Sequence, residues 1–301
     1  MTTETNHICV CVCTYKRPEL LKHLLSELRA QETAGLFTYS IVIVDNDQLQ
    51  SAESVVQEFS ESSPVPVKYC VQPQQNIALT RNMAVANASG DFLAFIDDDE
   101  FPEKNWLLTL VTTCEKYKVE GVLGPVKSYF AERPPKWIVK SNYFTRPINP
   151  TGEIVDWREA RTGNVLVRTR VFTPGEEPFR AEFRMGEDKD FFRRMIEKGH
   201  AFVWSADAVA YEVVPRTRWK RTYMLKRALL RGASARQQPT CGPMSIAKSS
   251  VAVLVYGVAL PFALLLGQHR FMDLLSKLCD HLGKLLAFIG INPIKGQYVT
   301  E

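Results

Sequence analysis

Several features that mark particular classes of protein are scarce in this chain of 301 residues. Its seven cysteines include no pairs at the spacing of zinc ligands. The formal net charge of +4 is too small to indicate a nucleic-acid-binding protein, and only residues 216–236 form a basic stretch. No internal repeat and no low-complexity tract occurs. We therefore expect a globular chain with a full hydrophobic core, without cysteine-bound zinc and without nucleic acid as a partner.

The N-terminal region lacks the pattern of a secretory signal. Residues 1–7 are polar and acidic, without a basic segment or an apolar one. Cys9, Cys11 and Cys13 then alternate along an apolar run, so they should lie on one face of a strand. We interpret them as small buried apolar residues in a reducing compartment. The globular part is accordingly expected to stay in the cytosol.

Short apolar runs rich in β-formers alternate with helical patterns along the first half of the chain. The expected strands are 8–13, 40–45, 67–72, 92–97 and 121–126, and the expected helices are 19–31, 52–61, 76–88 and 103–117. This alternation predicts an α/β fold in which helices flank a mostly parallel sheet. Ligands bind such sheets at the carboxyl ends of the strands. The candidate site residues therefore lie at 14–17, 45–47 and 97–100.

The middle of the chain breaks this pattern. Residues 128–156 are rich in proline and aromatic residues and are predicted to form a long loop. Loops of this length inside compact domains are commonly functional or mobile. A second α/β stretch follows, with strands expected at 163–167 and 201–204 and a helix at 187–198.

An acidic motif follows the apolar run 92–96. Asp97, Asp98, Asp99 and Glu100 stand together at the predicted strand end, where their charges repel one another. A divalent cation that bridges carboxylates to phosphate oxygens compensates such repulsion. A solvated surface loop is the alternative interpretation of the same four residues.

Five motifs in order resemble family-2 inverting glycosyltransferases across residues 8–235. They are CTYKRP at 13–18, VDN at 44–46, NIALTRN at 76–82, SGDF at 89–92 leading into the aspartates, and GED at 186–188 followed by DFF at 190–192. The segments 95–100, 122–126 and 186–188 are most similar to succinoglycan-type β-glucosyltransferases of bacterial exopolysaccharide synthesis. The resemblance implies a GT-A fold, which is Rossmann-like, and a UDP-sugar donor.

The resemblance also implies residue roles. A nucleotide sugar would contact Thr14, Tyr15, Arg17, Asp45, Asn76, Arg81, Asp97 and Asp98. Asp97 and Asp99 would hold Mg²⁺ or Mn²⁺ at the diphosphate, and Asp98 would touch the ribose or the metal. Arginine suits phosphate because its planar fork donates two parallel hydrogen bonds. Two alternatives stay open: Arg17 and Arg81 as plain surface cations, and Asn76 and Asn82 as turn or helix-capping residues.

The same resemblance places the general base at the start of the helix 187–198. Asp188 is the predicted base and Glu187 the alternative, although acids are also expected at a helix start for dipole reasons. Relatives carry a histidine shortly before a Val-Pro pair. This chain departs from them, since the corresponding stretch contains Tyr211 and no histidine. Metal dependence is therefore an open question, and Arg216, Arg218 or Arg221 could supply the missing positive charge.

Two other functions use parts of the same pattern. A metal-dependent phosphohydrolase would use the aspartates but would want histidine ligands, and none of the five histidines stands beside them. A non-catalytic, membrane-bound saccharide-binding protein would explain the aromatic residues and leave the acids without a role.

The C-terminal region differs in character from the rest. Residues 249–267 form an uncharged run of about 19 residues, close to the ~20 that span a bilayer, interrupted by Gly257 and Pro261. Residues 271–289 form an amphipathic helical pattern suited to an interface. We expect a catalytic domain at 1–238 and a membrane-association segment at 239–301. Burial of the uncharged run in a soluble core is the alternative.

Cations flank the uncharged run on both sides, which does not fit a simple membrane crossing. A monotopic arrangement on the cytoplasmic face of the bacterial inner membrane fits better, with the basic residues facing anionic lipid headgroups. The acceptor expected at such a surface is a saccharide linked to polyprenyl diphosphate.

Overall fold

The computed structural model describes residues 5–141, 143–173, 175–183, 185–235 and 241–291. These residues belong to two compact units. The first comprises residues 1–128, 146–182 and 187–213, and the second comprises 129–145, 183–186 and 214–301. The first unit carries the predicted sheet and all the predicted site residues.

A seven-stranded sheet forms the centre of the first unit, with strand order β3-β2-β1-β4-β8-β6-β9. The strands are β1 (Asn6–Thr14), β2 (Phe37–Asp45), β3 (Val67–Val71), β4 (Phe92–Asp97), β6 (Gly121–Leu123), β8 (Val165–Arg168) and β9 (Phe202–Trp204). The first four strands are parallel, and β8 runs antiparallel to both β4 and β6. The α/β, Rossmann-like prediction is confirmed, with one reversed strand in a mostly parallel sheet.

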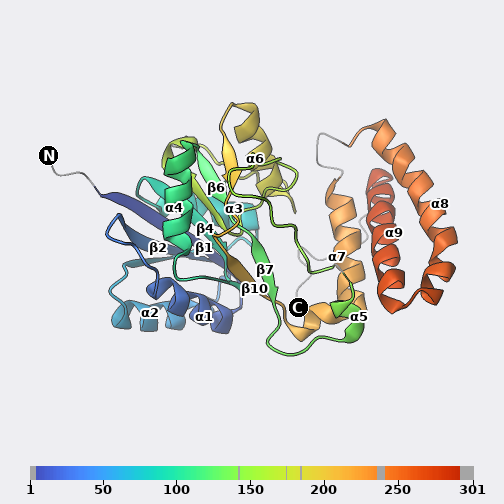
Figure 1. Ribbon diagram of the computed structural model, residues 1–301, viewed down its shortest axis with the longest axis horizontal. Coiled ribbons are helices and arrows are strands. Elements are labelled where there is room, and N and C mark those ends of the chain that lie inside the picture. The colour runs from blue at the N-terminus through green and yellow to red at the C-terminus, as the bar shows by residue number, and fades with distance from the viewer. Residues whose placement is uncertain (1–4, 142, 174, 184, 236–240, 292–301) are drawn as a thin grey trace. The chain divides into compact units, whose positions relative to one another are not determined.

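Five helices cover the two faces of this sheet (Figure 1). They are α1 (Pro18–Arg29), α2 (Glu53–Ser62), α3 (Ile77–Asn87), α4 (Trp106–Tyr117) and α6 (Glu187–Glu197). Alternate residues of each strand feed two separate cores, because successive side chains point to opposite faces. Val10 and Val12 pack with α1, α2 and α4, whereas Cys9 and Cys11 pack with α3 and α6. These two cysteines are free and buried, as predicted.

Strand register brings the predicted site residues together. In the parallel pairing of β1 with its two neighbours, Thr14 stands opposite Asp45, and Cys13 stands opposite Asp97. The last residues of three adjacent strands therefore lie at one edge of the sheet. The residues that follow them, including Arg17 and the acidic motif, start from that same edge.

A second, three-stranded sheet was not predicted. It contains β5 (Glu100–Pro102), β10 (Ala210–Val213) and β7 (Val126–Tyr129), in the order β5-β10-β7. The strand expected at 121–126 is divided between the two sheets at Gly124. A β-carbon there would lie 2.1 Å from the Ala208 carbonyl oxygen, so only glycine permits this approach. The predicted loop 128–156 also contains a short helix, α5 (Lys136–Val139).

The second unit is mainly a set of three helices (Figure 1). They are α7 (Arg221–Ser234), α8 (Pro243–Leu265) and α9 (Gln268–Phe288), and α9 packs against both of the others. Gly232 and Gly283 let α7 and α9 approach closely, since a β-carbon on either would lie about 2 Å from the other helix's backbone. Short 3-10 turns occur at Thr169–Val171 in the first unit and at Arg216–Trp219 in the second.

These helices add to the C-terminal prediction. The amphipathic segment 271–289 corresponds to α9, which packs against α7 and α8, and its placement at a membrane interface stays a prediction. The uncharged run is one continuous helix, α8, which passes through Pro261. The expected domain boundary at residue 238 lies outside the described residues, and the contacts place α7 with α8 and α9.

Candidate active site

The acidic motif lies at the β4–β5 turn and is held by residues from the end of β1. The Thr14 hydroxyl donates to Asp98 Oδ2 at 2.8 Å. Arg17 Nη1 donates to Asp98 Oδ1 at 3.1 Å and to Asp99 Oδ2 at 3.3 Å. Asp98, Asp99 and Glu100 are all buried, so this is not a solvated surface loop. Arg17 is likewise no plain surface cation.

Arg81 connects this edge of the sheet to the start of α6. Its guanidinium is 7% exposed and forms an ion pair with Glu187, and it also contacts Asp97 Oδ1 at 3.5 Å. Burial lowers the pKa of Arg81, but the Glu187 and Asp97 carboxylates outweigh it, and the net pKa is raised. Arg81 is therefore a permanent cation that links the two acidic groups of the site.

Burial dominates the electrostatics of the acids. It raises the pKa of Asp98 to about 7 despite the opposing charge of Arg17, and it raises the pKa of Glu187 to about 7 despite Arg81. The pKa of Glu100 is raised well above its usual value by burial and then by the Asp97 charge. The arginines present thus leave part of the negative charge uncompensated, which is the condition that a bound cation relieves.

We expect the stability of the ligand-free protein to fall as the pH rises from about 4 to about 7. Asp98 and Glu187 have native pKa values above their unfolded ones, so the native state binds more protons in this window, and the slope levels off above about 7. In chelator, the Tm should be several degrees higher at pH 5.5 than at pH 8, and Asp98→Asn should flatten the slope. A Tm that rises across this range would contradict the account.

Asp188 and Glu187 occupy different environments. The Glu187 carboxylate is 5% exposed and is engaged by Arg81. Asp188 is only partly buried, and its carboxylate accepts a hydrogen bond from the backbone N–H of Lys189 at 2.7 Å. Among the described residues no cation forms an ion pair with Asp188, and an accessible carboxylate of this kind can take a proton from a bound hydroxyl. This geometry favours Asp188 over Glu187 as the base, which stays a prediction.

Three predicted residues serve the architecture in this structure. Asp45 is fully buried, and its oxygens accept from the backbone of Asp47 and Ala52 and from the Tyr69 hydroxyl. Asn76 caps α3 by accepting from two backbone N–H groups. Asn82 holds residue 179 through both atoms of its amide. The capping alternative fits Asn76, whereas Asn82 lies within α3 and binds the backbone of another segment. A nucleotide contact by Asp45 or Asn76 stays a prediction.

Tyr211 does not stand in for the expected histidine. Its ring stacks on Phe101 at 5.3 Å, and its hydroxyl donates to Glu103 at 2.9 Å. The next residue, Glu212, pairs across β10 and β5 with Glu100 and forms an ion pair with Arg146 at 2.5 Å. Sequence reasoning missed Arg146 because its place at the acidic motif depends on the unpredicted second sheet.

No group of three or more histidine, cysteine or acidic side chains forms a ready-made metal cage within the residues that the structure describes. Tyr15, the remaining predicted nucleotide contact, is partly buried, and the Lys16 ammonium lies 5.2 Å from its ring centre.

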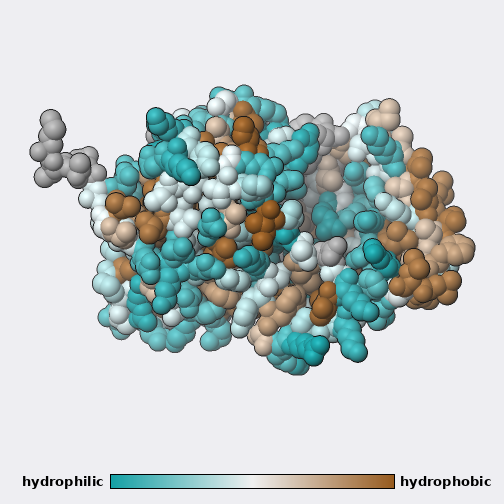
Figure 2. All heavy atoms as spheres, in the orientation of Figure 1, coloured by the Kyte–Doolittle hydropathy of each residue, from teal (hydrophilic) through white to brown (hydrophobic). Residues whose placement is uncertain are grey.

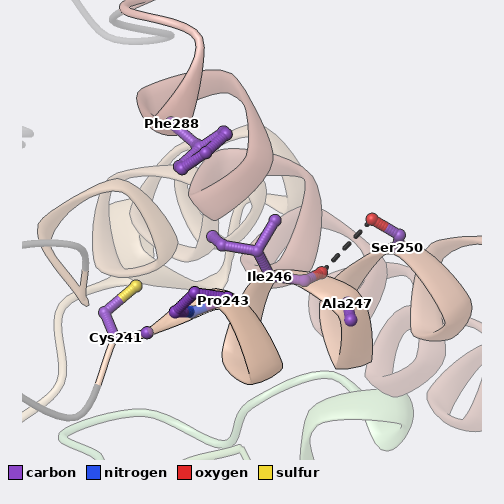
Figure 3. A pocket seen from close by; sticks show the side chains of 7 residues that line it. Cys241, Pro243, Ile246, Ala247, Ser250 and Phe288 are labelled. Carbon is purple, nitrogen blue, oxygen red and sulfur yellow. Dashed lines mark hydrogen bonds between the residues drawn. The ribbon is translucent and has the colours of Figure 1, made fainter.

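A cavity in the second unit contains none of the predicted residues. It measures about 390 Å³ and lies between the first turns of α8 and the end of α9 (Figure 3). Its lining includes Pro243, Ile246 and Phe288, and Ser250 donates to the Ile246 carbonyl within it. Without an ionisable carboxylate or arginine in its lining, it has none of the groups that the predicted chemistry needs.

The first unit has the architecture of a glycosyltransferase of the GT-A type, a Rossmann-like sheet with an acidic turn after β4 and an acid pair opening α6. The chain belongs to glycosyl transferase family 2, because the sequence model of that family matches residues 9–172. The succinoglycan biosynthesis protein ExoM of Rhizobium meliloti is 34% identical over 237 residues, which cover 77% of this chain and 75% of that protein. The chain is therefore a glycosyltransferase, as predicted.

Solved structures support the same fold. A mannosyltransferase from Pyrobaculum calidifontis, in complex with GDP-Man and Mn²⁺, matches with a TM-score of 0.63 at 16% identity, covering 94% of this chain and 88% of that one. TarS 1-349 of S. aureus in complex with UDP matches with a TM-score of 0.54 at 14% identity, covering 94% and 92%. Identities this low establish the fold alone.

Proposed function

We propose that this protein transfers a hexose, glucose or a relative, with inversion from a UDP-sugar to a lipid-linked saccharide in bacterial surface or exopolysaccharide synthesis. The accessible carboxylate of Asp188, which has no ion-pair partner among the described residues and lies near Asp97, carries the proposal. The name of the relative from Rhizobium meliloti supports the pathway, and the UDP-bound neighbour supports the nucleotide.

Inversion needs a base on the side of the sugar opposite the leaving diphosphate. Asp188 takes the proton from the acceptor hydroxyl as its oxygen attacks the anomeric carbon. Arg81 holds the Glu187 side chain in place beside the base. The two acids that open α6 thus have different roles. Glu187 is structural, and Asp188 reacts.

The residues of the acidic turn fit a hard divalent cation such as Mg²⁺ or Mn²⁺. Asp97 and Asp99 would hold it, since their oxygens are the ligands such ions prefer, and one or two carboxylates plus substrate phosphates suffice. Burial first, and the neighbouring carboxylates second, raise the pKa values of Asp98 and Glu100, and a bound cation would favour their charged forms. When bound, the ion neutralises charge that develops on the leaving diphosphate. Thr14 and Arg17 keep Asp98 and Asp99 oriented for this role.

A thermal-shift screen of UDP-, GDP- and dTDP-sugars tests the donor class. A ligand that binds only the folded state raises the Tm with the logarithm of its concentration. UDP-sugars should give the largest shift, and the shift should grow with Mn²⁺. A larger shift from a GDP- or dTDP-sugar would overturn the assignment of the nucleotide.

The outward face of α8 supports association with a membrane surface. This helix is long and apolar enough to cross a bilayer by length and composition alone, and 11% of its most apolar window is buried. Six of its large exposed apolar residues lie on one side of the helix, and Leu264 is exposed as well; the six are Val251, Leu254, Val255, Val258, Phe262 and Leu265. The two buried residues of the helix are Ser249 and Ala263, and Ser249 is bonded to His281 at 3.1 Å. Figure 2 shows the apolar residues gathered over this helix.

A soluble amphipathic helix turns its large apolar residues inward, whereas α8 leaves many of them exposed. Burial of the uncharged run in a soluble core is therefore not what the second unit shows. A bilayer is the environment that covers such a face, and a lipid-linked acceptor is the substrate found there. We propose the cytoplasmic face of the inner membrane, where UDP-sugars are made.

Glutamates on the outward face should release the full-length protein from membranes. Leu254, Val258 and Phe262 together changed to Glu should move most of the protein from the pellet to the supernatant in fractionation at low salt, because charged groups at the bilayer are costly. Ser54, Gln57 and Ser60 on exposed α2, changed to Glu, provide the matched control. Retention of the α8 variant as firmly as this control would show that α8 is not the anchor.

A further inference from the structure

The loop before β8 lies directly against the acidic turn. A β-carbon on Gly163 would stand 2.7 Å from Glu100 Oε1 and 3.1 Å from Asp97 Oδ2. The backbone of this loop therefore forms one wall of the acidic site. A side chain at this point would displace one or both of these carboxylates.

Asn164 fixes this loop in place. It is fully buried, with a left-handed φ of 61°. Its side-chain N–H groups donate to the carbonyls of Pro125 and Ala208 at 2.8 and 2.7 Å, and its oxygen accepts from Trp106 Nε1 at 2.7 Å. A residue other than glycine keeps such a φ only when surrounding contacts hold its backbone in place. Residues of this kind are concentrated at functional sites.

Arg161, two residues before Gly163, is the charged side chain of this rigid loop. It is partly buried, and within the part of the chain that the structure describes it has neither a hydrogen bond nor an ion pair. Burial lowers its pKa, and so does the charge of Arg146, while Glu100 and Asp188 oppose this. A partly desolvated guanidinium without a paired anion is unfavourable.

Arg146 contrasts with it in the same surroundings. Its guanidinium already has a partner, Glu212, which pairs across the strands with Glu100. Of the two arginines, Arg161 has its donors available. Five N–H donors in a planar fork match the geometry of phosphate oxygens.

We propose that Arg161 binds a phosphate group of a substrate, and that it supplies the positive charge which relatives obtain from the histidine absent here. The position of its loop against Asp97 and Glu100, and the nearby charges of Glu100 and Asp188, favour the diphosphate of the donor as the source of that phosphate. The sequence-based candidates Arg216, Arg218 and Arg221 belong to the other compact unit. This inference rests on the proposed function, since it assumes a nucleoside-diphosphate donor.

Binding of UDP and of uridine to Arg161→Gln, in the full-length protein with Mn²⁺, tests the proposal. UDP affinity should fall about tenfold or more, the scale of a lost charged hydrogen bond, while uridine affinity is unchanged. Arg161→Lys should recover part of the loss. Arg158→Gln is the matched control, because Arg158 is exposed and pairs with Asp156 away from the acids, and it should leave UDP binding unchanged.

The Tm without ligand separates binding from a structural role. Removing an unpaired, partly buried charge should leave the Tm of Arg161→Gln equal to or above that of the parent, whereas the loss of a structural arginine would lower it. If UDP affinity is unchanged and KM rises only for a phosphate-linked acceptor, the phosphate belongs to the acceptor. If neither changes, or if the Tm falls and uridine affinity falls equally, the proposal is overturned. A parent protein that binds no UDP would instead contradict the proposed function.

Discussion

Asp188→Asn should lower kcat by about 10² or more and leave donor affinity nearly unchanged. The amide is almost isosteric with the carboxylate but cannot accept the proton of the attacking hydroxyl, and loss of a general base has this scale. Because Asp188 is partly exposed and has no ion pair within the part of the chain that the structure describes, the substitution should also leave the Tm within a degree or two. Steady-state kinetics over a range of acceptor concentrations, with donor binding measured in parallel, checks both expectations.

Glu187→Gln is the informative comparison. It removes the charge that pairs with buried Arg81, so its main effect should be a loss of stability, visible in denaturant unfolding. Activity measured well below the unfolding midpoint should fall less than in Asp188→Asn. The assignment of the base is reversed if Glu187→Gln abolishes turnover in a folded protein while Asp188→Asn does not.

Asp99→Asn should abolish transfer, with kcat/KM lower by about 10³ or more, in a protein that remains folded. Several kcal/mol of charge stabilisation at the leaving diphosphate depend on the ion that Asp99 would hold. Activity in the parent protein should disappear in excess chelator and return with Mn²⁺ or Mg²⁺.

The matched control for this substitution is Asp91→Asn. Asp91 precedes β4 and accepts from the backbone N–H of His7 at 2.8 Å, away from the strand ends that form the site. It should retain transfer and the same metal response. Undiminished activity of the parent protein in chelator would show that no metal is needed. The arginines would then neutralise the charge of the leaving diphosphate.

The sequence predicts the sheet and the edge where the site forms, because long apolar strands and their terminal polar residues leave a strong pattern. It fails for β5 and β10, which have three and four residues, too few for a period to appear. Their pairing is what places Glu212 and Arg146 beside the acidic turn. Chemistry that depends on short, long-range strand pairs therefore emerges only from the structure.

Amphipathic periodicity likewise shows that a helix has an apolar side without showing what covers it. The helix α9 packs on α7 and α8. The run of α8 is apolar almost throughout, so the sequence does not show which of its residues are exposed. A similar limit applies to Arg161. The glycine and asparagine that follow it suggest a constrained turn, but only the structure shows that the turn faces Asp97 and Glu100.

The most direct test of the central claim is nucleotide release from a UDP-hexose, with and without a synthetic polyprenyl-diphosphate-linked saccharide, with the anomeric configuration of the product read by NMR. The account predicts that UDP release is strongly stimulated by the acceptor and that an α-linked donor gives a β-linked product. Release at the same rate without acceptor would indicate a hydrolase, and an α-linked product would contradict inversion with Asp188 as the base.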